Sequence, residues 1–356
     1  MVITDASQVT PEWLNQVLTQ AGALGTGAVS RFEITPGGGN WSSNARLRVQ
    51  YTRGSTGPKP PGLFLKMCPA VQSGFVLESE VDYYTRDYAG CDDAPLVPCY
   101  DARYSRSVGA YHILLDDLTE THQTTWQVTP TLEHALTLAR SLATLHAYRW
   151  GEARWEGTAG VMPSQATLTR YIDHISKGLE PMLNDVRGDV PPVWETTLRR
   201  IFRTHPRLMV ERTRNPEGFT LVHGDVNRGN VLAPHAAEGK TYIIDRQPFD
   251  WSLTTWLAAS DLAYMIIPWW EETSRRELEM PVLTEYHAEL VRRGVTEYPW
   301  DAFLADYRLC IFETVDTAVE WCGTEDDLRD KKWVWYPELQ RAMAAFDDWR
   351  CSELIG

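Results

Sequence analysis

Three oxygen-bearing side chains with chemical potential stand close together in the chain: Asp225, Asn230 five residues later, and Asp245 fifteen residues after that. The last one follows the apolar run Tyr242-Ile-Ile. Amide and carboxylate oxygens suit Mg²⁺, which takes one or two protein carboxylates together with substrate phosphates and several waters. The remaining carboxylate can orient an attacking hydroxyl. This set is the minimum for phosphoryl transfer, in which the protein mainly positions groups and offsets charge.

His223 offers a second interpretation of the same segment. A His-x-Asp pair can belong to a metal hydrolase, but such a site needs further histidine ligands at suitable spacings. The other histidines are scattered through the sequence. The alternative is a buried histidine that braces the loop around Asp225.

A lysine upstream adds a cation to the set. Lys66 lies between Leu65 and Met67 in an apolar, strand-like run. An unpaired ammonium there would be costly, so a carboxylate partner is expected. Glu78 and Glu80 are both candidates, because helical periodicity alone does not decide between them.

A glycine-rich segment, 37–43, precedes the Lys66 run by one strand-like stretch. Glycines let backbone N–H groups approach phosphate oxygens, and serine hydroxyls can add hydrogen bonds. Any hairpin turn can be glycine-rich, so this pattern is weak unless the neighbouring strand carries the phosphate-binding lysine.

Taken in order, these strings resemble the aminoglycoside phosphotransferase and choline kinase superfamily. The matching strings are Leu-Phe-Leu-Lys66, Glu80-x-x-x-Tyr84, His-Gly-Asp225-x-x-x-x-Asn230 and Ile-Ile-Asp245. Matches run from about Gly37 to Ala263, and they are most similar to the ecdysteroid-kinase-like branch. Order and spacing agree together, which makes the resemblance specific.

The resemblance implies an α+β, bilobal, protein-kinase-like fold. A small β-sheet lobe, 1–118, would bind nucleotide, and a larger, mainly helical lobe, 119–356, would carry catalysis and the acceptor. The implied reaction moves the γ-phosphate of ATP or GTP, with Mg²⁺, to a hydroxyl of a small molecule. A catalytically silent nucleotide-binding module is the alternative, suggested by the atypical glycine loop and Arg246.

The resemblance also assigns roles to residues. Asp225 would be the catalytic base, and Asn230 and Asp245 would bind the metal. Arg228 would steady developing charge, or else be a solvated loop residue. Nucleotide-binding roles fall to Lys66, Glu80 (favoured over Glu78), Gly39, Ser42, Ser43, Asp116 and Leu118.

Two further residues, Asp261 and Arg246, are expected to lie around the site. Asp261 is expected to bond backbone N–H groups of the catalytic loop. Arg246 stands where this branch commonly has an aromatic residue, directly after Asp245. We expect it either to pair with Asp245 and weaken its hold on the metal, or to reach a phosphate or an anionic acceptor.

Composition narrows the class of partner. The chain has 356 residues, 43% of them apolar, and a net charge of −14. This balance argues against nucleic acid, whose binding needs a basic footprint, and against an anionic membrane surface. Six cysteines without a Cys-x-x-Cys pair fit a reducing compartment. We therefore expect a cytoplasmic enzyme, monomeric or homodimeric.

Periodicity places the regular elements. A capped helix is expected at 10–18, with Pro11 at its first position. Alternation predicts strands around a glycine loop and around Lys66. The expected strands cover 31–35, 45–51, 63–67 and 108–115, and further helices cover 76–88 and 130–150, with mostly helical structure after 251.

The acceptor is the least defined part. Residues 268–330 hold 16 Asp and Glu against 6 Arg and are rich in tryptophan. Acidic charge and indole rings can attract a cationic or aromatic substrate, or they can be solvated helix faces and core. We expect a small hydroxylated acceptor: an antibiotic such as an aminoglycoside or nucleoside, as for a resistance enzyme, or another natural product or metabolite.

Overall fold

The computed structural model describes residues 1–356 except 40–41, 70–75, 77, 152–160, 237–238 and 248. The chain forms two compact units, residues 1–124 with 232–250 and residues 125–231 with 251–356. The first contains an antiparallel sheet and the second is mainly helical, so the predicted α+β class is confirmed. The division at residue 118 into a nucleotide lobe and an acceptor lobe stays a prediction.

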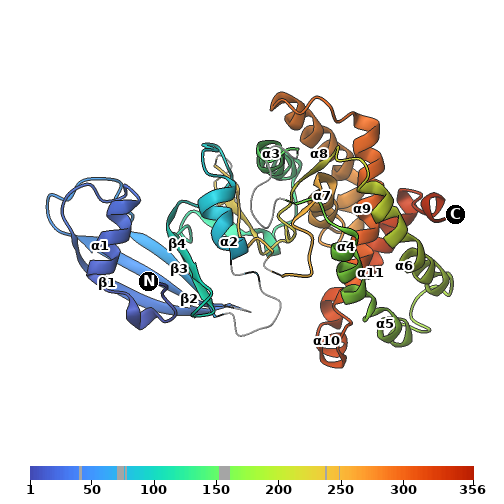
Figure 1. The fold of residues 1–356 in the computed structure, drawn as a ribbon, viewed down its shortest axis with the longest axis horizontal. Coiled ribbons are helices and arrows are strands. Elements are labelled where there is room, and N and C mark those ends of the chain that lie inside the picture. Colours follow the sequence, from blue (N-terminus) through green and yellow to red (C-terminus); the bar gives the residue numbers. More distant parts are fainter. Residues whose placement is uncertain (40–41, 70–75, 77, 152–160, 237–238, 248) are drawn as a thin grey trace. The chain divides into compact units, whose positions relative to one another are not determined.

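The first unit is built on a twisted antiparallel sheet with the strand order β1-β2-β3-β5-β4 (Figure 1). Its strands are β1 (Val29–Gly38), β2 (Ser43–Tyr51), β3 (Gly62–Pro69), β4 (Cys99–Ser105) and β5 (Ala110–Asp116). The predicted hairpin around the glycine-rich loop is the β1–β2 pair. Asn40 and Trp41, which belong to that loop, lie outside the described residues.

Alternation along β3 decides where Lys66 goes. Successive side chains of a strand point to opposite faces of the sheet. Leu63, Leu65 and Met67 belong to the core under helix α1 (Pro11–Gln20). Cys68 belongs to the core on the other face, with Val81 of helix α2 (Glu78–Asp82). Lys66 has the same parity as Cys68, so it is on the side of α2.

Helix α1 confirms the predicted N-terminal helix. Thr10 caps it by accepting a hydrogen bond from the Trp13 N–H at 3.2 Å, and Pro11 occupies the first turn. The predicted helix over 76–88 is also present in part, as α2 followed by a π-helical turn, η2 (Tyr83–Asp87). Turns of this kind are rare and frequently lie at functional sites. Residue 77, inside this prediction, is outside the described residues.

Short elements complete the first unit. A 3₁₀ turn, η1 (Ala6–Gln8), precedes α1. A small sheet has the order β6-β8-β9, with β6 (His122–Thr124), β8 (Val231–Pro234) and β9 (Tyr242–Ile243). The N–H of Ile243 donates to the Pro95 carbonyl at 2.9 Å. This bond helps to hold β9, which ends two residues before Asp245.

The second unit is a helical assembly with one short strand pair, β7 (Phe219–Leu221) with β10 (Thr255–Leu257). A 3₁₀ turn, η3 (Thr125–Gln127), opens it. Its helices are α3 (Leu132–Tyr148), α4 (Gln165–Ser176), α5 (Leu179–Asp185), α6 (Val193–Arg212), α7 (Ala258–Ile266), α8 (Glu272–Arg292), α9 (Trp300–Glu320), α10 (Glu325–Asp330), α11 (Lys332–Asp348) and α12 (Ser352–Ile355). The predicted helix over 130–150 is α3.

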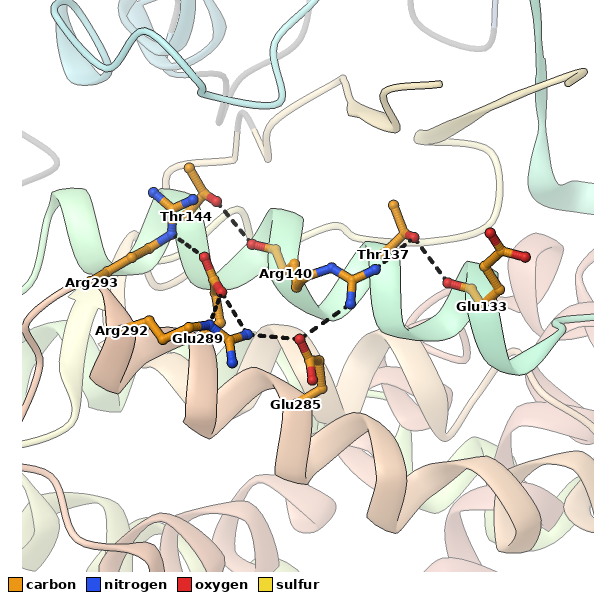
Figure 2. A network of polar contacts seen from close by, with 8 residues as sticks. All are labelled: Glu133, Thr137, Arg140, Thr144, Glu285, Glu289, Arg292 and Arg293. Carbon is orange, nitrogen blue, oxygen red and sulfur yellow. Dashed lines mark hydrogen bonds and ion pairs between the residues drawn. The ribbon is translucent and has the colours of Figure 1, made fainter. Parts of the chain in front are cut away.

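Ion pairs link α3 to α8 (Figure 2). Arg140 of α3 donates to Glu285 of α8 at 3.2 Å, and Arg292 also binds Glu285, at 2.7 Å. Glu289 is bound by Arg292 and Arg293. These acidic residues of the stretch 268–330 are therefore neutralised within the protein, which favours a paired, solvated helix face over substrate attraction for this part of it.

The described part of the chain has no helix with the length and apolarity needed to cross a membrane.

Candidate active site

Lys66 sits between two carboxylates within the first unit. Its Nζ lies 2.9 Å and 2.8 Å from Glu80 Oε1 and Oε2, and 2.9 Å from Asp245 Oδ1. Burial by itself would lower the pKa of the ammonium, but the two carboxylates outweigh it and the pKa of Lys66 is raised. The lysine therefore carries its charge at neutral pH.

Glu80, rather than Glu78, is the partner of Lys66. Glu78 instead forms an ion pair with Arg106. The Glu80 carboxylate also accepts a hydrogen bond from the Tyr111 hydroxyl at 2.6 Å. Burial, opposed by Lys66, raises the pKa of Glu80 to about 7. Helix α2 thus places a buried carboxylate against the lysine, and neighbouring strand β5 holds it there.

Asp245 adopts an unusual backbone conformation. Its φ is +60°, in the left-handed region that non-glycine residues seldom enter. Such strain costs about 1–3 kcal/mol and persists where the surrounding contacts impose it. On either side, the Tyr83 hydroxyl donates to the Ile243 carbonyl at 3.0 Å, and the Ser79 hydroxyl donates to the Gln247 carbonyl at 2.6 Å. Helix α2, which carries Glu80, and the following turn η2 therefore both hold the segment around Asp245.

The expectation for Arg246 is wrong. Its side chain neither pairs with Asp245 nor is available to a ligand, because it is 1% exposed and forms an ion pair with the fully buried Asp87 of η2. Burial of one guanidinium requires a carboxylate partner, and Asp87 meets that requirement. Arg246 directly follows Asp245, and this adjacency suggested that the two side chains would pair. The left-handed backbone at Asp245 instead turns the chain, so that the Arg246 side chain meets Asp87.

The Asp225 carboxylate is held by three donors within the second unit. Its Oδ1 accepts from Asn227 Nδ2 at 2.8 Å and from the Tyr264 hydroxyl at 3.1 Å. Its Oδ2 accepts from Asn230 Nδ2 at 2.9 Å. Asn230 also donates to the Asp225 carbonyl at 2.9 Å. The loop therefore folds back on itself and fixes the direction of the carboxylate.

Asp261 anchors this loop from helix α7, as the sequence predicted. It accepts from the N–H of His223 at 2.6 Å and from that of Gly224 at 2.8 Å. His146 of α3 contacts the same carboxylate at 3.0 Å through Nε2. Burial raises the pKa of Asp261, but these donors outweigh burial and lower it, so Asp261 is a charged anchor at neutral pH.

His223 is 2% exposed, and its Nδ1 accepts from the Asp225 N–H at 3.3 Å. This matches the predicted bracing role. No group of three His, Cys, Asp or Glu side chains suited to a metal ion occurs in the described ranges. The hydrolase interpretation therefore has no ligand set there.

Arg228 is bound to carbonyl oxygens of its own unit. It donates through Nε to Thr125 at 3.0 Å, through Nη2 to Val128 at 2.7 Å, and through Nη1 to Trp269 at 3.4 Å. Burial, with help from Arg341, lowers its pKa. Its guanidinium is thus bound by backbone carbonyls of the protein, although the side chain is only half-buried. These contacts support a role in positioning the Asp225 loop, and stabilisation of transferred phosphate stays a prediction.

The remaining predicted nucleotide-binding residues lie in the first unit. The N–H of Gly39 donates to the Ser42 carbonyl at 3.0 Å, and the Ser42 hydroxyl bonds to Asn44 at 3.1 Å. Ser43 begins β2, Asp116 ends β5, and Leu118 packs beside the core on the α2 side of the sheet. These positions are compatible with the predicted roles, which stay predictions.

The structure thus brings Lys66, Glu80 and Asp245 together in one unit, and Asp225, Arg228 and Asn230 in the other. Sequence reasoning missed Asn227 and Tyr264. Asn227 lies two residues after Asp225, and Tyr264 lies three residues, or about one helical turn, after Asp261. That spacing was a usable signal for Tyr264, because α7 directs both side chains to the same loop.

Solved structures with a similar fold include three that are described as small-molecule kinases. A choline kinase from Cryptosporidium parvum Iowa II is 12% identical, with 92% of this chain and 94% of that chain covered and a TM-score of 0.60. An ethanolamine kinase from Plasmodium vivax is 13% identical, with 89% and 82% covered and a TM-score of 0.52. A glucosamine kinase in complex with glucosamine, ADP and inorganic phosphate is 14% identical, with 95% and 85% covered and a TM-score of 0.54. No curated protein sequence matches the chain.

Fold and family together define the class: the protein is a small-molecule kinase, a phosphotransferase with an alcohol group as acceptor. More particularly, residues 83–295 match the model of the ecdysteroid kinase-like family, and the chain belongs to that family. This confirms the predicted superfamily and branch.

Proposed function

We propose that this protein transfers the γ-phosphoryl group of ATP or GTP to a hydroxyl of a small acceptor, with Asp225 as the base. The observation that best supports this proposal is the fixed direction of the Asp225 carboxylate. Asn227, Asn230 and Tyr264 donate hydrogen bonds to it, and Asp261 anchors the loop that carries it. A carboxylate held in one direction can orient a hydroxyl, which is most of what a kinase must do for its acceptor.

In the proposed step, the acceptor hydroxyl lies against Asp225 and its oxygen attacks the γ-phosphorus. The new O–P bond forms as the bond between that phosphorus and the β–γ bridging oxygen breaks. The proton of the hydroxyl passes to the Asp225 carboxylate late in the transfer. The products are the phosphorylated acceptor and the nucleoside diphosphate.

Lys66 is proposed to bind the α- and β-phosphates as a compact cation. Glu80 keeps it in place from a buried position, 3% exposed. Within the fold, Gly39, Ser42 and Ser43 stand at the end of the hairpin next to β3, and they are proposed to cover the phosphates through N–H and hydroxyl groups. The segment from Asp116 to Leu118 is proposed to border the base. A co-substrate nucleotide is supported by the ADP in the glucosamine kinase complex.

The donor set fits Mg²⁺. The Asn230 amide nitrogen is used in bonds to Asp225, which turns the amide oxygen away from that residue. Asp245 is 45% exposed, although Lys66 contacts it. Both offer hard oxygens, as this ion prefers. When bound, the ion would neutralise charge on the phosphates. Asn230 and Asp245 are the residues proposed to hold it.

The proposal is tested by screening hydroxylated antibiotics, sugars and amino alcohols with ATP and with GTP, detecting phosphorylated products by mass spectrometry. With any acceptor found, Asp225→Asn should lower kcat by about 10²–10⁴-fold, because the base is lost. Thermal stabilisation by nucleotide with Mg²⁺ should remain. Asp173→Asn, on an exposed position of α4, is the matched control. Unchanged turnover in Asp225→Asn would reject the proposal.

A further inference from the structure

Three polar residues of α2 and η2 share one face of that segment: Ser79, Tyr83 and Asp87, each four positions after the last. In an α-helix, residues four apart drift by about 40° per step, because 3.6 residues complete a turn. The wider π-helical turn over Tyr83–Asp87 holds more residues and compensates for this drift. All three side chains therefore meet the same stretch of chain, residues 243–247.

Asp87 supplies the charge on this face. It is fully buried, and its carboxylate is bound from two sides, with Oδ1 3.0 Å from Arg86 Nη2 and Oδ2 paired with Arg246. Because both oxygens are bound, the carboxylate has one direction. Separating two desolvated charges is costly. The position of the Arg246 guanidinium is therefore fixed relative to η2.

The fixed Arg246 is the residue directly after Asp245, whose φ is +60°. A non-glycine residue keeps such a conformation only where its surroundings impose it. Hydrogen bonds hold the backbone at Ile243 and at Gln247, two residues to either side. Arg246 is the held position nearest to the strained residue. Its release would let the turn relax and the Asp245 carboxylate change direction.

The same segment also positions the phosphate-binding lysine. Glu80, next to Ser79, binds Lys66, and Lys66 in turn contacts Asp245 at 2.9 Å. The contacts thus close a ring that runs from Lys66 through α2 and η2 to Arg246 and back through Asp245. A helix segment tied in this way sets the directions of the lysine and of the aspartate together.

We propose that Arg246, held by Asp87, is a positioning residue that imposes the left-handed turn and thereby directs the Asp245 carboxylate toward Mg²⁺. The inference rests on the proposed function, in which Asp245 is a ligand of that ion. Residues that orient a metal ligand from outside typically change metal affinity about 10–100-fold when they are replaced. Loss of the pair should therefore weaken metal binding even where the fold is kept.

The role is tested by binding Mn²⁺ to the protein–ADP complex, followed by electron paramagnetic resonance, with Mn²⁺ and ADP alone as the blank. Mn²⁺ takes the same oxygen ligands as Mg²⁺. In the double variant Asp87→Leu with Arg246→Met no charge stays buried, so the melting temperature should recover toward that of the wild type. The dissociation constant of Mn²⁺ should still rise at least about tenfold, because an apolar contact has no fixed direction. Arg31→Met, in an exposed ion pair of β1, is the control and should change neither value.

A second variant guards against misfolding of the double variant. Arg246→Lys keeps the buried charge but loses the planar guanidinium, and it should also weaken Mn²⁺ at least about tenfold. Mn²⁺ binding as tight as in the wild type in both variants overturns the positioning role. So does a loss of Mn²⁺ affinity that follows the loss of melting temperature from variant to variant.

Asp245→Ala separates this inference from the proposed function. If it abolishes Mn²⁺ binding while the Arg246 variants bind normally, only the positioning role fails. If Asp245→Ala binds Mn²⁺ as the wild type does, the proposed metal role of Asp245 is rejected, and the positioning role with it.

Discussion

Lys66 Nζ and Asp245 Oδ1 lie 2.9 Å apart, although 179 positions separate the two residues in the chain. The same ammonium is bound by Glu80. One cation thereby joins strand β3, helix α2 and the turn after β9. Because the proposed phosphate-binding group and one proposed metal ligand touch, nucleotide binding should redistribute the contacts of this lysine.

Replacement of Lys66 tests that role. Lys66→Met should lower kcat/KM for the nucleotide by about 10²–10³-fold, since a preorganised cation on the phosphates is lost. The Michaelis constant for nucleotide should rise as well. Steady-state kinetics at varied ATP measures both. Lys59→Met, at a half-buried lysine of the same unit that donates to the Ser55 carbonyl at 2.8 Å, should keep the nucleotide kinetics of the wild type. Equal activity of the two variants contradicts the role of Lys66.

Asp261 should control the geometry of the catalytic loop. In Asp261→Asn, one of the backbone donors of His223 and Gly224 loses its acceptor, which should lower the free energy of unfolding by about 1–3 kcal/mol. It should also lower kcat more than the Michaelis constants, because Asp225 is misplaced. Urea denaturation and kinetics provide the two values.

The control for this variant is Asp306→Asn. Asp306 is also buried and binds Arg212 and Tyr298 in the same unit. It should destabilise comparably while kcat is kept. If Asp306→Asn lowers kcat as much as Asp261→Asn, the effect of Asp261 is only a general loss of stability.

The buried pair of Asp87 and Arg246 should be a major stabilising contact of the first unit. Asp87→Ala leaves a buried guanidinium without this carboxylate and should cost about 3–5 kcal/mol in the free energy of unfolding. The double variant Asp87→Leu with Arg246→Met should recover much of that loss, because no charge stays buried. Denaturant unfolding of the single and double variants measures the coupling free energy between Asp87 and Arg246. If the losses of the two single variants simply add in the double variant, the two residues are not coupled.

A pH dependence of stability should come from Glu313 of α9. It accepts from Trp256 and Ser260, and His205 and Asp316 face it. Burial raises its pKa to about 7 from an ordinary value of 4.5, even though His205 and the two donors oppose the rise. Between pH 4.5 and 7 the folded state therefore holds a proton that the unfolded state has released.

The contribution of Glu313 to the free energy of unfolding should accordingly fall as the pH rises through that window, by up to about 3 kcal/mol. Glu313→Gln removes this pH dependence of the free energy of unfolding. The free energy of unfolding of the variant should therefore rise relative to that of the wild type between pH 5 and pH 7.5. Glu277→Gln, exposed on α8, should follow the wild type. A constant difference between Glu313→Gln and wild type at both pH values would refute this.

The sequence by itself determined the local chemistry. Alternation around Lys66, the Thr10-Pro11 start of α1 and the spacing of Asp225 and Asn230 depend on residues close in the chain, whose preferences act over a few positions. The Asp261 anchor was predictable as well, through the family resemblance. The class of enzyme followed from the order of these strings.

Only the tertiary structure decided which distant groups meet. Periodicity left Glu78 and Glu80 open and only the resemblance favoured Glu80, whereas the contact itself depends on how α2 packs against β3. The direction of the Arg246 side chain depends on the left-handed backbone at Asp245. Pairings of this kind are fixed by packing and by the cost of buried charge, which no local pattern records.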